Sequence, residues 1–131
     1  MLTDLTNPSG FVIAPPRSRS NSCIDFLNFV IFLIDSHALV AGDIFIVDNA
    51  SIHNASLIEI PLALLLDRYR IRIAFLPSYS PELNPCELIF CQMKTHLRKR
   101  IGDDLLWIDM IYALNCVSYE NVLSYYRKCI F

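Results

Sequence analysis

At 131 residues the chain has the length of a single domain, by the usual range of about 100–200 residues per domain. Hydrophobic residues make up 54% of it, so it has ample material for a core. The formal net charge of −2 excludes a protein that is strongly basic overall, as many nucleic-acid binders are.

The sequence predicts neither a secreted protein nor a membrane protein. The first ten residues include an aspartate and no apolar stretch, so they do not predict a secretory signal. The most hydrophobic run, residues 26–34, has about half of the roughly 20 residues that a membrane span needs, and we read it as a core helix. We expect a nuclear protein in a eukaryote and a cytoplasmic one otherwise. The cysteines are odd in number, lack a C-x-x-C pair and are expected to be reduced, small, buried residues: Cys23, Cys86, Cys91, Cys116 and Cys129.

The chain begins with a segment that is poor in regular structure. Residues 1–21 combine prolines and a glycine with a polar run, and we expect an irregular leader in which residues 10–14 are a candidate short strand. A helix is expected from Cys23 to about Leu39, with Asn21 or Ser22 as its N-cap.

Short apolar strands then alternate with helices. Residues 43–47 are apolar and β-branched, which is typical of a strand that is buried on both faces. A second helix is expected to begin at residues 54–56, and a half-buried strand at residues 70–76. A third helix is predicted from Pro85 to about Arg100, since proline suits the first turn of a helix.

Two further helices, over residues 104–117 and 120–129, complete the predicted elements. The alternation of strands and helices predicts an α/β fold with parallel strands and right-handed crossovers. Two parallel strands need neighbours, so residues 22–131 are expected to form only part of a domain.

Two motifs carry the chemistry of the chain. The first, IFIVDNASIH over residues 44–53, places Asp48 where a strand ends. The second, LPSYSPELNPCELIFCQMK over residues 76–94, places Glu87 just after a helix begins. Ligands of open parallel sheets gather beyond the carboxyl ends of the strands. Converging carboxylates there could hold two divalent cations about 4 Å apart, which is the arrangement that cleaves phosphodiesters.

At these two motifs the chain resembles the DDE endonuclease domain of the mariner superfamily of transposases. The resemblance covers residues 22–100 and implies an incomplete ribonuclease-H-like domain with trailing C-terminal helices. It implies that Asp48 and Glu87 are catalytic carboxylates that bind Mg²⁺ or Mn²⁺. Taken singly, each of the two would be an ordinary turn or helix-start residue, and only the conjunction of the motifs favours the functional interpretation.

The resemblance also implies DNA as the partner, in the intact family the ends of a transposon. The residues expected to contact nucleic acid are Asn49, His53, Tyr79, Asn84, Lys94 and Arg98. For the basic stretch around Lys94, a solvated helix face is an equally good interpretation. The aromatic residues of the last two helices are expected to pack in the core rather than to stack on bases.

The family places its first catalytic aspartate on a strand well upstream of the second, and none of this chain's other aspartates is expected to fill that role. The hypothesis is therefore a transposase-derived fragment with the second and third carboxylates of the site and no activity alone. The alternative is a non-catalytic remnant that binds nucleic acid or protein. A missing N-terminal half or self-association is expected to complete the fold.

Overall fold

The computed structural model describes residues 1–6, 11–12, 21–50, 55–99 and 106–129. The chain divides into two compact units, one of Arg17–Ser80 and one of Met1–Pro16 together with Pro81–Phe131. They are called the sheet unit and the helical unit below.

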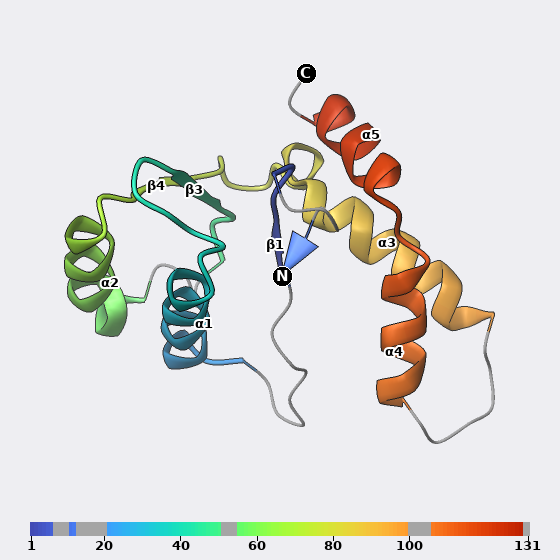
Figure 1. Cartoon of the computed structure of the whole chain (residues 1–131), viewed down its shortest axis with the longest axis horizontal. Coiled ribbons are helices and arrows are strands. Elements are labelled where there is room, and N and C mark those ends of the chain that lie inside the picture. Colours follow the sequence, from blue (N-terminus) through green and yellow to red (C-terminus); the bar gives the residue numbers. More distant parts are fainter. Residues whose placement is uncertain (7–10, 13–20, 51–54, 100–105, 130–131) are drawn as a thin grey trace. The chain divides into compact units, whose positions relative to one another are not determined.

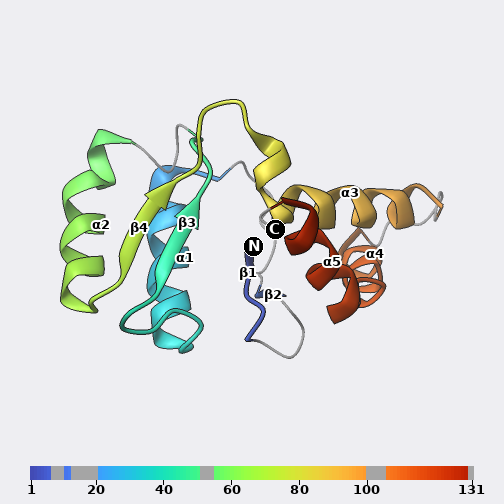
Figure 2. The ribbon, with the colours of Figure 1, turned by 90° about the horizontal axis from the view of Figure 1, so that it is seen from above.

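The sheet unit contains two helices and two parallel strands. In chain order these are α1 (Cys23–Asp35), β3 (Ile44–Val47), α2 (Ser56–Arg68) and β4 (Arg72–Phe75). Strands β3 and β4 pair in parallel, with Ile44 opposite Arg72 and Val47 opposite Phe75 (Figure 2). Helices α1 and α2 contact each other and lie on the same side of this sheet (Figure 1).

Helix α1 has a complete capping box. The Ser22 hydroxyl accepts a hydrogen bond from the Asp25 amide at 3.3 Å, and the Asp25 carboxylate accepts one from the Ser22 amide at 2.9 Å. The predicted N-cap is thus confirmed, but the helix ends at Asp35 rather than at about Leu39. His37 takes a left-handed φ of 58°, and the amides of the next two residues bond back to the carbonyl of Leu33, which closes the helix early.

The sheet is covered on one face within its own unit. Phe45 and Val47 are buried, and the Phe45 ring stacks on Phe26 of α1 with centroids 6.3 Å apart. Ile44 and Ile46 alternate with them and are 52% and 53% exposed. The expectation of a strand buried on both faces is therefore wrong here, because both helices of the unit pack on the same side.

Helix α2 packs through one regular stripe. Its buried residues are Ile58, Leu62 and Leu66, at the i, i+4, i+8 spacing of a single helical face. The helix begins at Ser56, within the expected range 54–56, and its N-cap, Ala55, makes no side-chain cap hydrogen bond.

The helical unit is built around α3 (Pro85–Arg98). The short helix η1 (Pro81–Leu83) precedes it, and α4 (Leu106–Asn115) and α5 (Tyr119–Cys129) pack against it. The core of this unit is apolar and is made of Ile89, Met93, Ala113, Leu114, Val117 and Val122.

Two short strands also belong to the helical unit. Strand β1 (Leu2–Thr3) pairs antiparallel with β2 (Phe11–Val12), and β1 contacts α3. Residues 2–3 were expected to be irregular, whereas the strand at 11–12 falls within the candidate range 10–14. The Tyr126 hydroxyl donates to the Thr3 carbonyl at 2.9 Å, so α5 fixes β1 in place.

The described residues thus form a mixed α/β protein with five α-helices and a short parallel sheet. This confirms the predicted fold class of an incomplete ribonuclease-H-like domain that ends in helices. Among the helices of the described residues, none has both the length and the apolar character needed to span a membrane. The division of the chain at residue 21 into a leader and a partial domain stays a prediction.

Candidate functional site

Asp48 lies directly beyond the carboxyl end of β3, as the first motif predicts. The ladder continues past the strands, because the Leu76 amide donates to the Val47 carbonyl at 2.8 Å. Just beyond, the Asn49 side-chain amide donates to the Ser78 hydroxyl at 2.8 Å. The two loops that follow the parallel strands are therefore joined at one edge of the sheet, where the ligands of such sheets bind.

The carboxylate of Asp48 is partly exposed at this edge. One of its oxygens accepts a hydrogen bond from the Ala50 amide at 3.4 Å, which is a turn-type contact two residues along the chain. Asp48 thus has both a local structural role and access to solvent. A carboxylate at a strand end with partial exposure is the donor type that a hard, hydrated cation prefers.

Tyr79 occupies the loop after β4 in an unusual conformation. Its φ is 59°, in the left-handed region that bulky residues rarely enter, and its side chain is fully exposed. Ser78, which precedes it, receives the hydrogen bond from Asn49. Sequence reasoning does not single out Ser78. Its position directly after Pro77, in the turn beyond a strand, is the signal that could have found it.

Glu87 lies in the helical unit, on the first turn of α3. The helix begins as predicted, with Asn84 as N-cap and Pro85 as its first residue. The Asn84 carboxamide oxygen accepts from the Cys86 amide at 3.1 Å, which satisfies one of the free amides of the first turn. Glu87 is exposed at this end of the helix.

The exposed face of α3 carries more than Glu87. Lys94 and Arg98 follow it at seven and eleven residues and are also exposed, so all three share one side of the helix. At a rise of 1.5 Å per residue, the two cations lie roughly 10 Å and 16 Å along the axis from Glu87. Ile89 and Met93 occupy the opposite, buried face.

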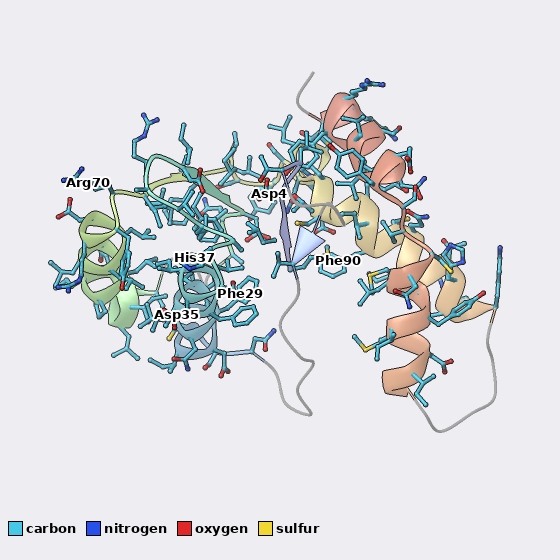
Figure 3. The ribbon with its side chains drawn as sticks, in the orientation of Figure 1. Asp4, Phe29, Asp35, His37, Arg70 and Phe90 are labelled. Carbon is cyan, nitrogen blue, oxygen red and sulfur yellow. The ribbon has the colours of Figure 1, made fainter. Side chains whose placement is uncertain are left out.

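Two further residues, His53 and Asn84, were predicted to contact nucleic acid. His53 lies outside the described residues. Asn84 acts as a helix cap, and its expected contact with nucleic acid stays a prediction. Arg70, labelled in Figure 3 at the turn between α2 and β4, is exposed and takes a left-handed φ of 56°. Arg68 and Arg72, on either side of it, are exposed as well.

Three other aspartates accept hydrogen bonds from groups close to them in the sequence. Asp4, labelled in Figure 3, follows β1 and accepts from the Thr6 amide and hydroxyl, each at 2.8 Å. Asp25 closes the capping box of α1 and is buried. Asp43 precedes β3, at the opposite end from Asp48, and accepts from the Val40 amide at 2.9 Å. Each of these contacts is turn or cap chemistry of the ordinary kind.

Cysteine and aromatic side chains were assigned to the core by sequence. All five thiols are free, but only Cys129 is buried, so the expectation of five buried cysteines is wrong. Tyr125 and Tyr126 pack against the core of the helical unit, as expected, whereas Tyr112 of α4 is 45% exposed and contradicts the expectation. Burial raises the pKa of the Tyr126 phenol above its ordinary value of 10.0.

The donors that a metal ion requires are present in part. Asp48 and Glu87 offer carboxylate oxygens with solvent access, and this chemistry fits Mg²⁺ or Mn²⁺, which retain several bound waters. Among residues 1–6, 11–12, 21–50, 55–99 and 106–129, no group of three or more His, Cys, Asp and Glu side chains is gathered for an ion. The two carboxylates belong to different units of the chain.

Comparison with protein families finds one model that matches residues 1–105, the family of DDE superfamily endonucleases. The match spans most of the chain and includes both motifs, and the chain belongs to this family. Comparisons with curated proteins and with solved structures give no significant match.

Proposed function

We propose that this chain is part of a transposase-type DNA endonuclease in which Asp48 and Glu87 serve as two of the metal-binding carboxylates. The observation that carries the proposal is the position of Asp48. It follows β3 at the edge where the loops after both parallel strands are joined by the Asn49–Ser78 hydrogen bond. The family membership supports the reaction class, the cleavage of a DNA phosphodiester.

Glu87 supplies the second carboxylate from a helix start. Its place on the first turn of α3 fixes its backbone through the Asn84 cap, so the side chain is presented from a rigid element. Divalent ions held by such carboxylates neutralise the phosphate and promote ionisation of the attacking water or hydroxyl. The residues of this chain position the ions and the DNA strand.

In this proposal the DNA backbone binds along the exposed face of α3, next to Glu87. Lys94 and Arg98 lie on that face, and each can neutralise one phosphate. With two such cations among the described residues of this face, binding is expected to be weak and strongly dependent on salt, since affinity falls with each counterion released. DNA binding by this chain should therefore rely on the divalent ion for much of its strength.

Cleavage needs more ligands than these two. A positioned carboxylate is expected to be missing from the chain's own set, so we propose that the chain alone holds metal and DNA without cutting the strand. Loss of one ligand removes part of the electrostatic stabilisation on which phosphoryl transfer depends.

The test measures DNA binding by fluorescence anisotropy, in Mg²⁺ and in EDTA, for the parent chain, Asp48→Asn and Glu87→Gln. The parent should bind more tightly in Mg²⁺, and each variant should lose that increase while keeping its weak binding in EDTA. Equal affinities for all three chains in Mg²⁺ would contradict the proposal and favour a non-catalytic remnant.

A nicking assay on supercoiled DNA with Mg²⁺ or Mn²⁺ accompanies this test, and no nicking is expected. Nicking by the parent would show that another carboxylate completes the site. Asp4→Asn should then be examined first, because Asp4 also follows a strand and β1 contacts α3.

A further inference from the structure

The loop after β4 presents an aromatic ring to solvent at the proposed DNA site. Tyr79 is 101% exposed, so its ring makes almost no contact with the rest of the chain. A tyrosine normally buries most of its ring and keeps only the hydroxyl wet. Here the whole ring is available to a ligand.

The backbone that holds this ring is also unfavourable for tyrosine. Its φ of 59° lies in the left-handed region, where a residue with a Cβ is strained and glycine is not. Glycine would satisfy this turn better than tyrosine does. Residues kept in such conformations cluster at binding and catalytic sites, where the side chain has a use that offsets the strain.

The loop is fixed at the edge that carries Asp48. The Ser78 hydroxyl is bonded to the Asn49 side chain at 2.8 Å, and Asn49 follows Asp48 directly. Prolines at positions 77 and 81 bracket the loop and restrict its backbone. The ring is therefore presented by a restrained loop whose partner loop begins at Asp48.

The surroundings of the ring favour a nucleobase over an apolar protein surface. Its sequence neighbours are Ser78 and Ser80, and the joined loop contributes Asp48 and Asn49, so polar groups flank the ring. A base stacks on a single aromatic ring and leaves its polar edges to water or to polar side chains. A protein interface would instead call for a contiguous apolar patch.

We propose that Tyr79 stacks on an unpaired base next to the DNA phosphate that Asp48 engages. The inference rests on the proposed function and defines the substrate more closely as DNA with an unstacked base beside that phosphate. A base inside an intact duplex is already stacked on both sides and cannot reach the ring. The chain should therefore prefer a single strand, or a gap, to a duplex of the same sequence.

The experiment uses the full chain in Mg²⁺ and an oligonucleotide with one 2-aminopurine, whose fluorescence falls when it stacks on an aromatic ring. The parent chain and Tyr79→Phe should quench the single-stranded probe and leave the same probe in a duplex unchanged. Tyr79→Gly should abolish the quenching and weaken single-strand binding by roughly 5- to 150-fold. Tyr69→Ala is the matched control, an exposed tyrosine of the same unit at the other end of β4, and should behave as the parent.

Thermal melting separates this role from a structural one. Tyr79→Gly relieves the left-handed strain, so its melting temperature should equal or exceed that of the parent. Quenching by Tyr79→Gly at the parent's level would overturn the inference, and so would a lower melting temperature that accompanies weaker binding. A change in oligomeric state with unchanged quenching would also overturn it, in favour of a protein contact.

Failure here can be told apart from failure of the proposed function. If Tyr79→Gly matches the parent while Asp48→Asn still abolishes the Mg²⁺-dependent part of binding, the stacking role is wrong and the proposed function stands. If Asp48→Asn and the parent bind alike, the proposed function fails, and the inference that rests on it fails with it.

Discussion

Asp48 and Glu87 are positioned in two contrasting ways. Asp48 follows a strand of the sheet unit, and hydrogen bonds between the loops beyond β3 and β4 restrain its surroundings. Glu87 lies on the first turn of a helix in the other unit, where Asn84 caps the chain and the side chain is exposed. The difference teaches that each carboxylate is placed by the local rules of its own element, one by strand pairing and one by helix capping.

The two units also differ in what they offer to DNA. Residues 48–50 and 76–80 of the sheet unit contain no Lys or Arg and present polar side chains and the Tyr79 ring. The exposed face of α3 presents the cations Lys94 and Arg98 beside Glu87. In the proposed function the sheet unit therefore stacks on a base, and the helical unit neutralises charge on the DNA backbone.

The largest expected effects come from the two cores. Leu33 in the sheet unit and Ile89 in the helical unit are fully buried, and truncation of either to alanine should cost about 2–5 kcal/mol. Hydrogen exchange should show lost protection in α1 and β3 for Leu33→Ala, and in α3 to α5 for Ile89→Ala. Equal loss of exchange protection in both units from either variant would show that the two units unfold together. That result would contradict the description of two separately stabilised units.

Helix caps should give smaller, equally local effects. Ser22→Ala removes the capping box of α1, and Asn84→Ala removes the cap of α3, each at a cost of about 0.5–2 kcal/mol. Chemical denaturation should measure each loss of stability, and hydrogen exchange should assign it to the unit that contains the substituted cap. Ser22→Asn and Asn84→Ser retain a capping oxygen and should keep most of the stability. If the alanine and the conservative variants lose the same amount, capping is not the cause.

High pH should weaken the helical unit selectively. Burial, with smaller contributions from Cys86 and Asp4, raises the pKa of Tyr126, while its hydrogen bond with Thr3 acts in the opposite sense. Between 10.0 and this raised value the unfolded chain loses the phenol proton and the folded chain keeps it. The contribution of the protonated Tyr126 to stability is therefore complete below pH 10.0, and it is lost as the pH rises through the pKa of Tyr126 in the folded chain.

Denaturant midpoints measured from pH 8 to 11 for the parent chain and for Tyr126→Phe provide the check. The parent should lose stability above pH 10.0 more steeply than the variant, because the variant has no phenol at this position to titrate. Parallel pH profiles for the two chains would contradict the role given to Tyr126.

The smallest effect is expected at the junction of the two loops. The Asn49–Ser78 hydrogen bond is exposed, so Asn49→Ala or Ser78→Ala should cost about 0.5–1.5 kcal/mol or less. Amides of residues 76–80 should exchange faster in either variant, and the double variant should lose no more than one of them. Additive losses would mean that the two side chains act separately.

Much of this architecture follows from local signals in the sequence. The Asn84-Pro85 pair predicts the start of α3, Ser22 predicts the cap of α1, and the apolar run before Asp48 predicts β3. These features depend on neighbours within a few residues, so the sequence contains the information that determines them. The same is true of Asp48 as a strand-end residue and Glu87 as a first-turn residue.

Features that depend on distant neighbours were predicted less well. The exposure of Ile44 and Ile46 depends on both helices packing on one side of the sheet, which periodicity does not specify. The early end of α1 depends on His37 entering a left-handed conformation that carries no strong residue signal. Strand β1 depends on pairing with β2 and on the Thr3–Tyr126 contact across most of the chain.

The most direct test of the central proposal, that Asp48 and Glu87 are metal-binding carboxylates, compares Mn²⁺ affinities, read from the electron paramagnetic resonance of free Mn²⁺. The chains are the parent, Asp48→Asn, Glu87→Gln and the double variant. Asp35→Asn and Glu82→Gln serve as exposed carboxylate controls, one from each unit, and should bind as the parent does. The proposal predicts that each site variant weakens Mn²⁺ binding and that the double variant binds no more tightly than either. A site variant that binds Mn²⁺ like the parent would contradict it.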